Sequence, residues 1–186
     1  MRCFIAIDIN DQLRSRIDRL QKELQRRLKN QSGIKWVRPE IIHLTLKFLG
    51  DVEDDRTEEI SGAIEHICAA HKSFELEFST VGTFGRPAKV LWLGVEKTSS
   101  ELEKLVLDFE QGFEELGFAK EQRPFSAHLT LARIKDDRPG KQLAEVITGF
   151  GKVDAGTITA DAVCLYKSQL TSDGPVYTLL RKINFT

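Results

Sequence analysis

The tetrapeptide His-Leu-Thr-Leu occurs twice in this chain, at residues 43–46 and again at residues 128–131. Each copy lies in a run that alternates apolar and polar residues, within 41–50 and 125–134, and such alternation predicts a strand. Residues two apart in a strand point to the same side. Each copy therefore places a histidine and a threonine on one face and two leucines on the other. The leucine face is suited to a core, and the His/Thr face is left for something polar.

The same order of elements surrounds both copies. The patterning predicts helices at 11–31, 54–71, 99–117 and 140–150, and further strands at 2–9, 74–81, 89–95, 157–168 and 176–185, with a turn at Asp173-Gly174-Pro175. After the opening strand, each half reads helix, HLTL strand, helix, strand, strand. The pattern indicates an internal duplication in the α+β class. Residues 1–186 are expected to form one domain of two pseudo-symmetric lobes, each with one HxT motif.

Composition narrows the class of protein. The formal net charge is −1, whereas a protein that grips a long nucleic acid backbone usually carries a strong positive excess. Any nucleic acid partner is therefore expected to be short, or held only by its end. No apolar run reaches the roughly 18 residues of a membrane span, and the N-terminus lacks a secretory pattern, so a cytoplasmic protein is expected. Cys3, Cys68 and Cys164 are widely spaced without a CxxC pair, which predicts buried free thiols.

Two HxT strands have a chemical interpretation. If a pseudo-twofold axis relates the lobes, both polar faces meet in one cleft, which then holds two imidazoles and two hydroxyls. With an unperturbed pKa near 6.5, one histidine can act as a base while the other is a protonated acid. On opposite sides of a phosphorus atom, the pair suits in-line displacement, and each threonine can donate to a phosphoryl oxygen. This chemistry requires no metal.

The motif also has less specific interpretations. A single HxT strand is usually structural, and duplication can copy a harmless tetrapeptide. The flanks have diverged while all four letters agree, which favours a use for the polar pair. A zinc site needs three or four ligands, and neither motif has a nearby cysteine or second histidine. His66 and His71 are five apart on a helix, do not share a face, and are expected at the surface.

With these two motifs, the sequence resembles the 2H phosphoesterase superfamily, and within it the RNA 2′,3′-cyclic phosphodiesterases, also called 2′-5′ RNA ligases. The resemblance rests on "RCFIAIDI", "WVRPEIIHLTLKFLGDV", "FSAHLTLARI" and "LYKSQLTSDGPVYTLL". It implies two antiparallel sheets that face a central cleft, with helices packed on the outside. It also implies hydrolysis of RNA 2′,3′-cyclic phosphate ends to 2′-phosphomonoesters, without a metal or cofactor. RNA 3′ ends or small cyclic nucleotides would be the partners of a monomeric enzyme.

The resemblance also implies roles for residues. His43 would protonate the leaving oxygen and His128 would lie on the water side, although the sequence itself does not break the symmetry between them. Thr45 and Thr130 would bind phosphoryl oxygens. Arg133 matches the family's phosphate-contacting arginine, but strict alternation turns it away from His128 unless a bulge or the strand's end re-aims it.

Weaker candidates for substrate contact remain. Lys47 has the alternation that would place it beside His43, and Trp36 is either a stacking surface for a base or a core residue. The remaining candidates are Phe48, Arg38 and Tyr166. Two alternatives to hydrolysis stay open: the reverse reaction, which forms a 2′-5′ linkage, and a non-catalytic module that binds RNA ends or nucleotides. The intact His and Thr of both copies argue against the module.

Overall fold

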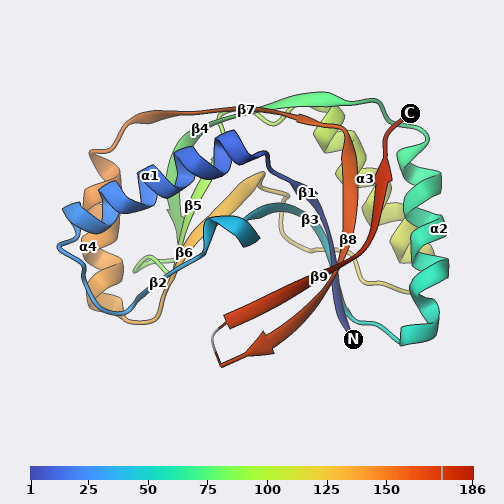
Figure 1. Cartoon of the computed structure of the whole chain (residues 1–186), viewed down its shortest axis with the longest axis horizontal. Coiled ribbons are helices and arrows are strands. Elements are labelled where there is room, and N and C mark those ends of the chain that lie inside the picture. Colours follow the sequence, from blue (N-terminus) through green and yellow to red (C-terminus); the bar gives the residue numbers. More distant parts are fainter. Residues whose placement is uncertain (173) are drawn as a thin grey trace.

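The computed structural model describes residues 1–172 and 174–186 and has an α+β fold built on one antiparallel sheet (Figure 1). The strands are β1 (Arg2–Asp8), β2 (Ile34–Trp36), β3 (His43–Asp51), β4 (Phe74–Phe84), β5 (Val90–Val95), β6 (His128–Ile134), β7 (Lys152–Ala160), β8 (Ala162–Thr171) and β9 (Gly174–Asn184). They follow the order β7-β4-β5-β6-β3-β1-β8-β9, and β2 pairs with β6. The two HLTL strands, β3 and β6, are therefore neighbours at the middle of the sheet.

The helices gather at the two ends of this sheet. They are α1 (Asp11–Arg27), α2 (Thr57–Cys68), α3 (Ser100–Glu115) and α4 (Asp137–Thr148), with short 3₁₀ turns at Pro39–Ile41 and Asp54–Arg56. Helices α2 and α3 pack against each other, with α2 on β8 and β9 and α3 on β3, whereas α1 contacts β7 and α4 contacts β4 and β6 (Figure 1). The middle of the sheet, where β3 meets β6, lies between these two groups of helices.

Helix α1 shows how the sequence builds one of these elements. Its N-cap residue Asn10 accepts a hydrogen bond from the Leu13 amide at 2.8 Å, which satisfies one of the free donors at the helix start. Leu13, Ile17, Leu20 and Leu24 are buried at helical spacing. The expected extension to residue 31 is wrong because the chain leaves the helix after Arg27 and passes through the left-handed region at Lys29 and Asn30.

Three features of the sheet correct the expectations from the sequence. The single strand expected at 157–168 is two strands, β7 and β8, which meet at Asp161 and pair at opposite ends of the sheet. The short strand β2 was not expected. Instead of two separate sheets there is one, because β3 and β6 are joined by a single bridge between Leu44 and Leu129. One bridge is enough to make the two halves continuous, and no alternation pattern reveals it.

The smaller expectations have mixed outcomes. All three cysteines are buried and free, as predicted, and His66 is exposed. His71 is buried, which corrects its expected surface position: its Nε2 atom lies 2.8 Å from Asp108 Oδ2 on α3. Of the expected turn at 173–175, residue 173 lies outside the described residues. No helix in the described part of the chain is long and apolar enough to cross a membrane.

Candidate active site

The bridge between β3 and β6 aligns the two motifs. Leu44 lies opposite Leu129, both side chains are fully buried, and each leucine directly follows its histidine. One residue to either side of this bridge, the antiparallel register places His43 opposite Thr130 and Thr45 opposite His128. Residues opposite one another in an antiparallel pair point to the same side of the sheet. All four polar side chains therefore belong to one side of the sheet, which we call the HxT face, and all four are partly exposed.

Both imidazoles are held in the same way. The Nδ1 atom of His43 lies 2.9 Å from the Ile41 carbonyl oxygen, and the Nδ1 atom of His128 lies 2.8 Å from the Ser126 carbonyl oxygen. A carbonyl oxygen only accepts, so each Nδ1 carries the proton and donates it. In each neutral ring, Nε2 is then the basic nitrogen, and in each charged ring Nε2 is the free donor. Each histidine thus presents one reactive nitrogen in a fixed tautomer.

His43 lies among aromatic rings. Phe4 stacks on its imidazole with ring centroids 4.7 Å apart, and Tyr177 meets it edge-on at 5.2 Å. This burial lowers the pKa of His43 because it disfavours the charged ring; the hydrogen bond to Ile41 and the charge of Asp8 act in the opposite direction. Asp8 lies directly opposite His43 in the β1–β3 register. The neutral imidazole is therefore favoured at His43 in the free protein.

His128 has different surroundings. Its ring meets the Phe84 ring edge-on, with centroids 5.0 Å apart, and Phe84 in turn lies 5.4 Å from Trp92. Trp92 lies opposite Thr130 in the β5–β6 register, so it belongs to the HxT face. The hydrogen bond that holds His128 is exposed to solvent, whereas that of His43 is partly buried. The two motifs are thus equivalent in backbone geometry and distinct in environment.

A β-bulge in each central strand decides which later residues join this face. In the β1–β3 pair, Ala6 lies opposite Thr45 and Ile5 opposite Lys47, so Leu46 has no partner. The extra residue reverses the alternation that follows it. Lys47 therefore turns inward and Phe48 turns outward, with exposed fractions of 4% and 69%.

Lys47 does not lie on the HxT face, which corrects its expected contact with substrate. Its Nζ atom lies 2.6 Å from Glu110 Oε2 on α3 and donates to the Ala119 carbonyl oxygen at 3.1 Å. Glu110 also accepts a hydrogen bond from the Glu121 amide at 3.1 Å. The buried pair thus ties β3 to the segment that leads into β6.

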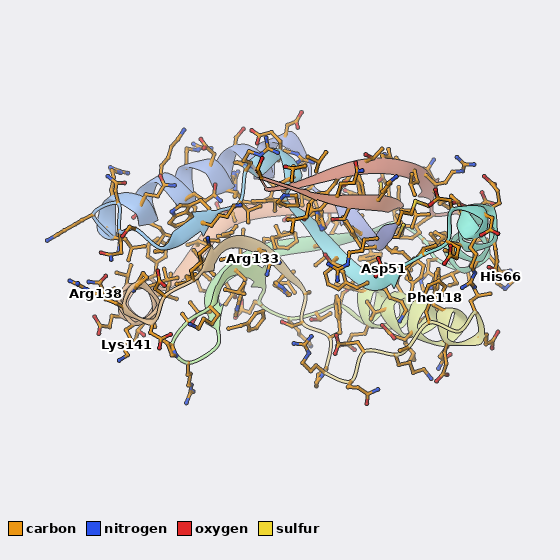
Figure 2. The ribbon with its side chains drawn as sticks, turned by 90° about the horizontal axis from the view of Figure 1, so that it is seen from below. Asp51, His66, Phe118, Arg133, Arg138 and Lys141 are labelled. Atoms are coloured by element: carbon orange, nitrogen blue, oxygen red, sulfur yellow. The ribbon has the colours of Figure 1, made fainter. Side chains whose placement is uncertain are left out.

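The second bulge brings Arg133 to the HxT face. Trp92 lies opposite Thr130 and Leu91 opposite Ala132, so Leu131 is the unpaired residue. Leu131 and Ala132 are both buried, and Arg133 is exposed on the side of Thr130. Figure 2 shows Arg133 near the middle of the molecule, between Lys141 at one end and Asp51 toward the other. Arg133 therefore lies on the same face as His128, which corrects the orientation that strict alternation predicts.

The remaining predicted contacts fall in three different places. Tyr166 lies among the aromatic rings around His43. Its ring stacks on Phe4 with centroids 5.4 Å apart, and its hydroxyl donates to the Asp8 carboxylate at 2.9 Å. Trp36 packs against the hydrophobic core, since it lies opposite Ala132, which faces inward. Arg38 is exposed and precedes the 3₁₀ turn that carries Ile41, the acceptor for His43.

Several further residues on this face could not be predicted from the HxT motifs, because neighbouring strands supply them. They are Phe4 and Asp8 on β1, Tyr177 on β9, Phe84 on β4, Trp92 on β5 and Lys35 on β2. Alternation in "RCFIAIDI" does put Phe4 and Asp8 on one side of their strand. Only the pairing of β1 with β3 places that side next to His43.

Other kinds of site have less support in this fold. Among residues 1–172 and 174–186, no group of three or more His, Cys, Asp or Glu side chains could hold a metal ion. An open hollow of about 1010 Å³ lies between α1 and β7, lined by residues that include Arg16, Arg26 and Asp154. None of its lining residues belongs to the HxT face.

Known structures share this fold. The crystal structure of TT0787 of Thermus thermophilus matches with a TM-score of 0.83 and 25% identity, covering 100% of this chain and 98% of the other. E. coli LigT complexed with 3′-AMP matches with a TM-score of 0.77 and 22% identity, covering 100% and 98% of the two chains. The fold is therefore that of LigT-like proteins.

Sequence comparison gives the family. The model of the 2′-5′ RNA ligase superfamily matches residues 9–171. The RNA 2′,3′-cyclic phosphodiesterase of Methanothermobacter thermautotrophicus is 36% identical, with 96% of this chain and 95% of the relative covered. The Archaeoglobus fulgidus protein of the same name is 33% identical, with 97% and 98% covered. This chain belongs to the 2′-5′ RNA ligase superfamily of 2H phosphoesterases.

Proposed function

We propose that this protein hydrolyses the 2′,3′-cyclic phosphate end of RNA to a 2′-phosphomonoester. The relatives named above carry that activity in their names. The observation that supports it in this chain is the register at Leu44 and Leu129, which brings two histidines and two threonines to one face, each histidine with its Nδ1 atom bonded to a backbone carbonyl. A binding module would not need two imidazoles held in the same tautomer.

The proposed reaction uses the two histidines on opposite sides of phosphorus. The Nε2 atom of His128 accepts a proton from water as the water oxygen forms its bond to phosphorus. The bond between phosphorus and the 3′ oxygen breaks, and protonated His43 donates its Nε2 proton to that oxygen. Thr45 and Thr130 donate hydrogen bonds to the non-bridging oxygens, and Arg133 offsets their growing charge. Phe48, exposed on the same face, offers a ring against which the terminal base stacks.

The low pKa of free His43 is compatible with its role as the acid. Burial favours the neutral ring while the site is empty, but a bound phosphodiester brings a negative charge next to the imidazole. That charge favours the protonated ring, so His43 gains its proton when substrate is present. Water excess drives the reaction toward hydrolysis, although the same pair serves the reverse, joining reaction.

The fold is proposed to be an internal duplication: one domain of two pseudo-symmetric lobes, each of which contributes one HxT motif. Three coincidences support it. Each histidine donates from Nδ1 to the carbonyl two residues earlier, each is followed by a bridging leucine, and each strand bulges at the third residue after the histidine. Because one chain supplies both motifs, the enzyme is expected to work as a monomer.

The function is tested by incubating the pure protein with an oligoribonucleotide that ends in a 2′,3′-cyclic phosphate, in excess EDTA. Conversion to the 2′-phosphate is the expected result, since no step uses a metal. Binding of the oligonucleotide without turnover would favour the module, and activity that returns only with added zinc or manganese would contradict the proposed chemistry.

A pH prediction separates the roles of the two histidines. The charged or titratable groups around His43 are Asp8 from β1, Arg14 from α1, Tyr166 from β8 and Tyr177 from β9. Asp8→Asn removes the negative charge that supports protonated His43, while its amide oxygen still accepts from Tyr166. The pKa of His43 should fall further. The acid must be protonated to react, so kcat/KM of Asp8→Asn should fall below that of the unmodified protein as the pH rises through the pKa of His43.

At low pH, where His43 is protonated in both proteins, the two values of kcat/KM should converge. A kcat/KM for Asp8→Asn that exceeds that of the unmodified protein at low pH and converges with it at high pH would make His43 the base and reverse the proposed assignment. Asp51→Asn is the matched control, because Asp51 is exposed at the far end of β3, opposite Arg2 (Figure 2). Its profile should overlay that of the unmodified protein.

A further inference from the structure

A row of residues crosses four strands beside the HxT motifs. Lys35 on β2 lies opposite Arg133 on β6, Arg133 lies opposite Val90 on β5, and Val90 lies opposite Phe84 on β4. Opposed residues share a face, so all four belong to the side that carries the HxT motifs. Two strand spacings separate the backbones of Arg133 and Phe84, or about 10 Å. That distance is within the reach of one nucleotide from its phosphate to its base.

The charged end of the row is suited to an anion. Like charges directly opposite each other in a sheet are destabilising, so Lys35 and Arg133 weaken the pairing of β2 with β6 unless an anion lies between them. Within residues 1–172 and 174–186, Arg133 makes no ion pair, although thirteen ion pairs occur elsewhere in that part of the chain. The position is cationic and solvent-exposed on both strands.

The other end of the row is a supported aromatic surface. Phe84 is 37% exposed and leans on Trp92 at a ring separation of 5.4 Å. Trp92 lies directly over Gly82, where an added Cβ would come within 2.3 Å of the indole. Any larger residue at position 82 would therefore displace Trp92 from beneath Phe84. The glycine and the indole together hold the phenyl ring with part of its surface open.

We propose that this row is a subsite for a second nucleotide of the RNA, the one on the 5′ side of the terminal cyclic phosphate. Its linking phosphodiester lies between Lys35 and Arg133, and its base stacks on Phe84. The guanidinium of Arg133 has five N–H donors, so it serves this phosphate together with the terminal one. The inference rests on the proposed function and specifies its substrate: an oligonucleotide of at least two residues is preferred to a cyclic mononucleotide. A base alone would bring no anion to Lys35 and Arg133. The internucleotide phosphate of RNA brings one, so the two cations favour a linked nucleotide as the occupant.

The test compares adenosine 2′,3′-cyclic phosphate with the dinucleotide ApA that ends in a 2′,3′-cyclic phosphate. The dinucleotide should have the higher kcat/KM. Phe84→Leu keeps an apolar side chain beside His128 but removes the ring, and Lys35→Gln removes the charge. Each should lower the ratio of kcat/KM for dinucleotide over mononucleotide by about 5-fold or more, as expected for the loss of a stacked base or a phosphate contact.

Two controls isolate the second nucleotide. Phe84→Tyr keeps the ring and should keep the ratio. A dinucleotide whose 5′ residue lacks its base should be a poorer substrate for the unmodified protein. Phe84→Leu should lower kcat/KM for this abasic dinucleotide only slightly further, because the base and the ring contribute to the same stacking contact. Lys141→Gln, a charge change on α4 away from the row, should leave the ratio unchanged (Figure 2).

Several outcomes would overturn the proposal. Equal kcat/KM for the mononucleotide and the dinucleotide would refute the subsite. If Phe84→Leu lowered kcat/KM equally for both substrates, the role of Phe84 would be only to support His128. A loss confined to joining a 5′-hydroxyl oligonucleotide would assign the row to the incoming strand. Absence of turnover on either substrate would defeat the proposed function instead. Binding of the 2′-phosphorylated dinucleotide is therefore measured in parallel, and unchanged binding in both Phe84→Leu and Lys35→Gln would refute the subsite by itself.

Discussion

His43→Ala and His128→Ala should each lower kcat for hydrolysis of an RNA 2′,3′-cyclic phosphate by about 10²- to 10⁴-fold. Each imidazole moves one proton in the proposed reaction, one to the leaving oxygen and one from water. The losses should not add: the double variant is expected to be little worse than either single one, because the two groups act in one transition state. Single-turnover rates at saturating substrate measure the effect.

Chemical rescue distinguishes lost proton transfer from lost structure. Added imidazole should restore part of the activity of His128→Ala, because the hydrogen bond that holds His128 is open to solvent. Rescue of His43→Ala should be weaker, since Phe4, Tyr166 and Tyr177 surround that ring. His66→Ala, at an exposed helix position, is the matched control and should keep full activity. A loss below tenfold in either motif variant would refute the two-histidine mechanism.

The HxT face could be predicted from the sequence because it depends only on alternation within each strand. His43 and Thr45 point to one side of β3 wherever that strand lies in the sheet. The neighbours of the histidines could not be predicted in the same way. Phe4 and Asp8 reach His43 through the β1–β3 pairing, and Phe84 reaches His128 across β5, so their positions depend on which strands meet.

The bulges set a second limit on prediction from the sequence. Alternation places Lys47 beside His43 and turns Arg133 away from His128, and the structure reverses both positions. One extra residue in each strand exchanges the two faces, and the leucines at those positions resemble the other leucines of the strands. The orientation of every residue beyond the third after each histidine therefore had to come from the pairing register.

Lys47→Ala should lower the free energy of unfolding by about 3–5 kcal/mol, the usual cost of leaving one charge of a buried pair alone. The side chain of Lys47 is 2% exposed and that of Glu110 is 15% exposed, so the remaining carboxylate is largely shielded from water. Denaturant unfolding of the pure protein measures the change. Lys47→Met with Glu110→Leu removes both charges together and should recover most of the loss, since no uncompensated charge stays buried.

Lys120→Ala is the matched control for this prediction. Lys120 pairs with Glu114 at the surface, with side chains 40% and 58% exposed, and its loss should cost under about 1 kcal/mol. The comparison also decides between the two interpretations of Lys47. Since Lys47 and Glu110 hold the segment that leads to His128, the single variant should lose stability first and activity only as it unfolds. A stable Lys47→Ala protein with a raised KM for RNA would mean that Lys47 binds substrate, and would contradict its burial against α3.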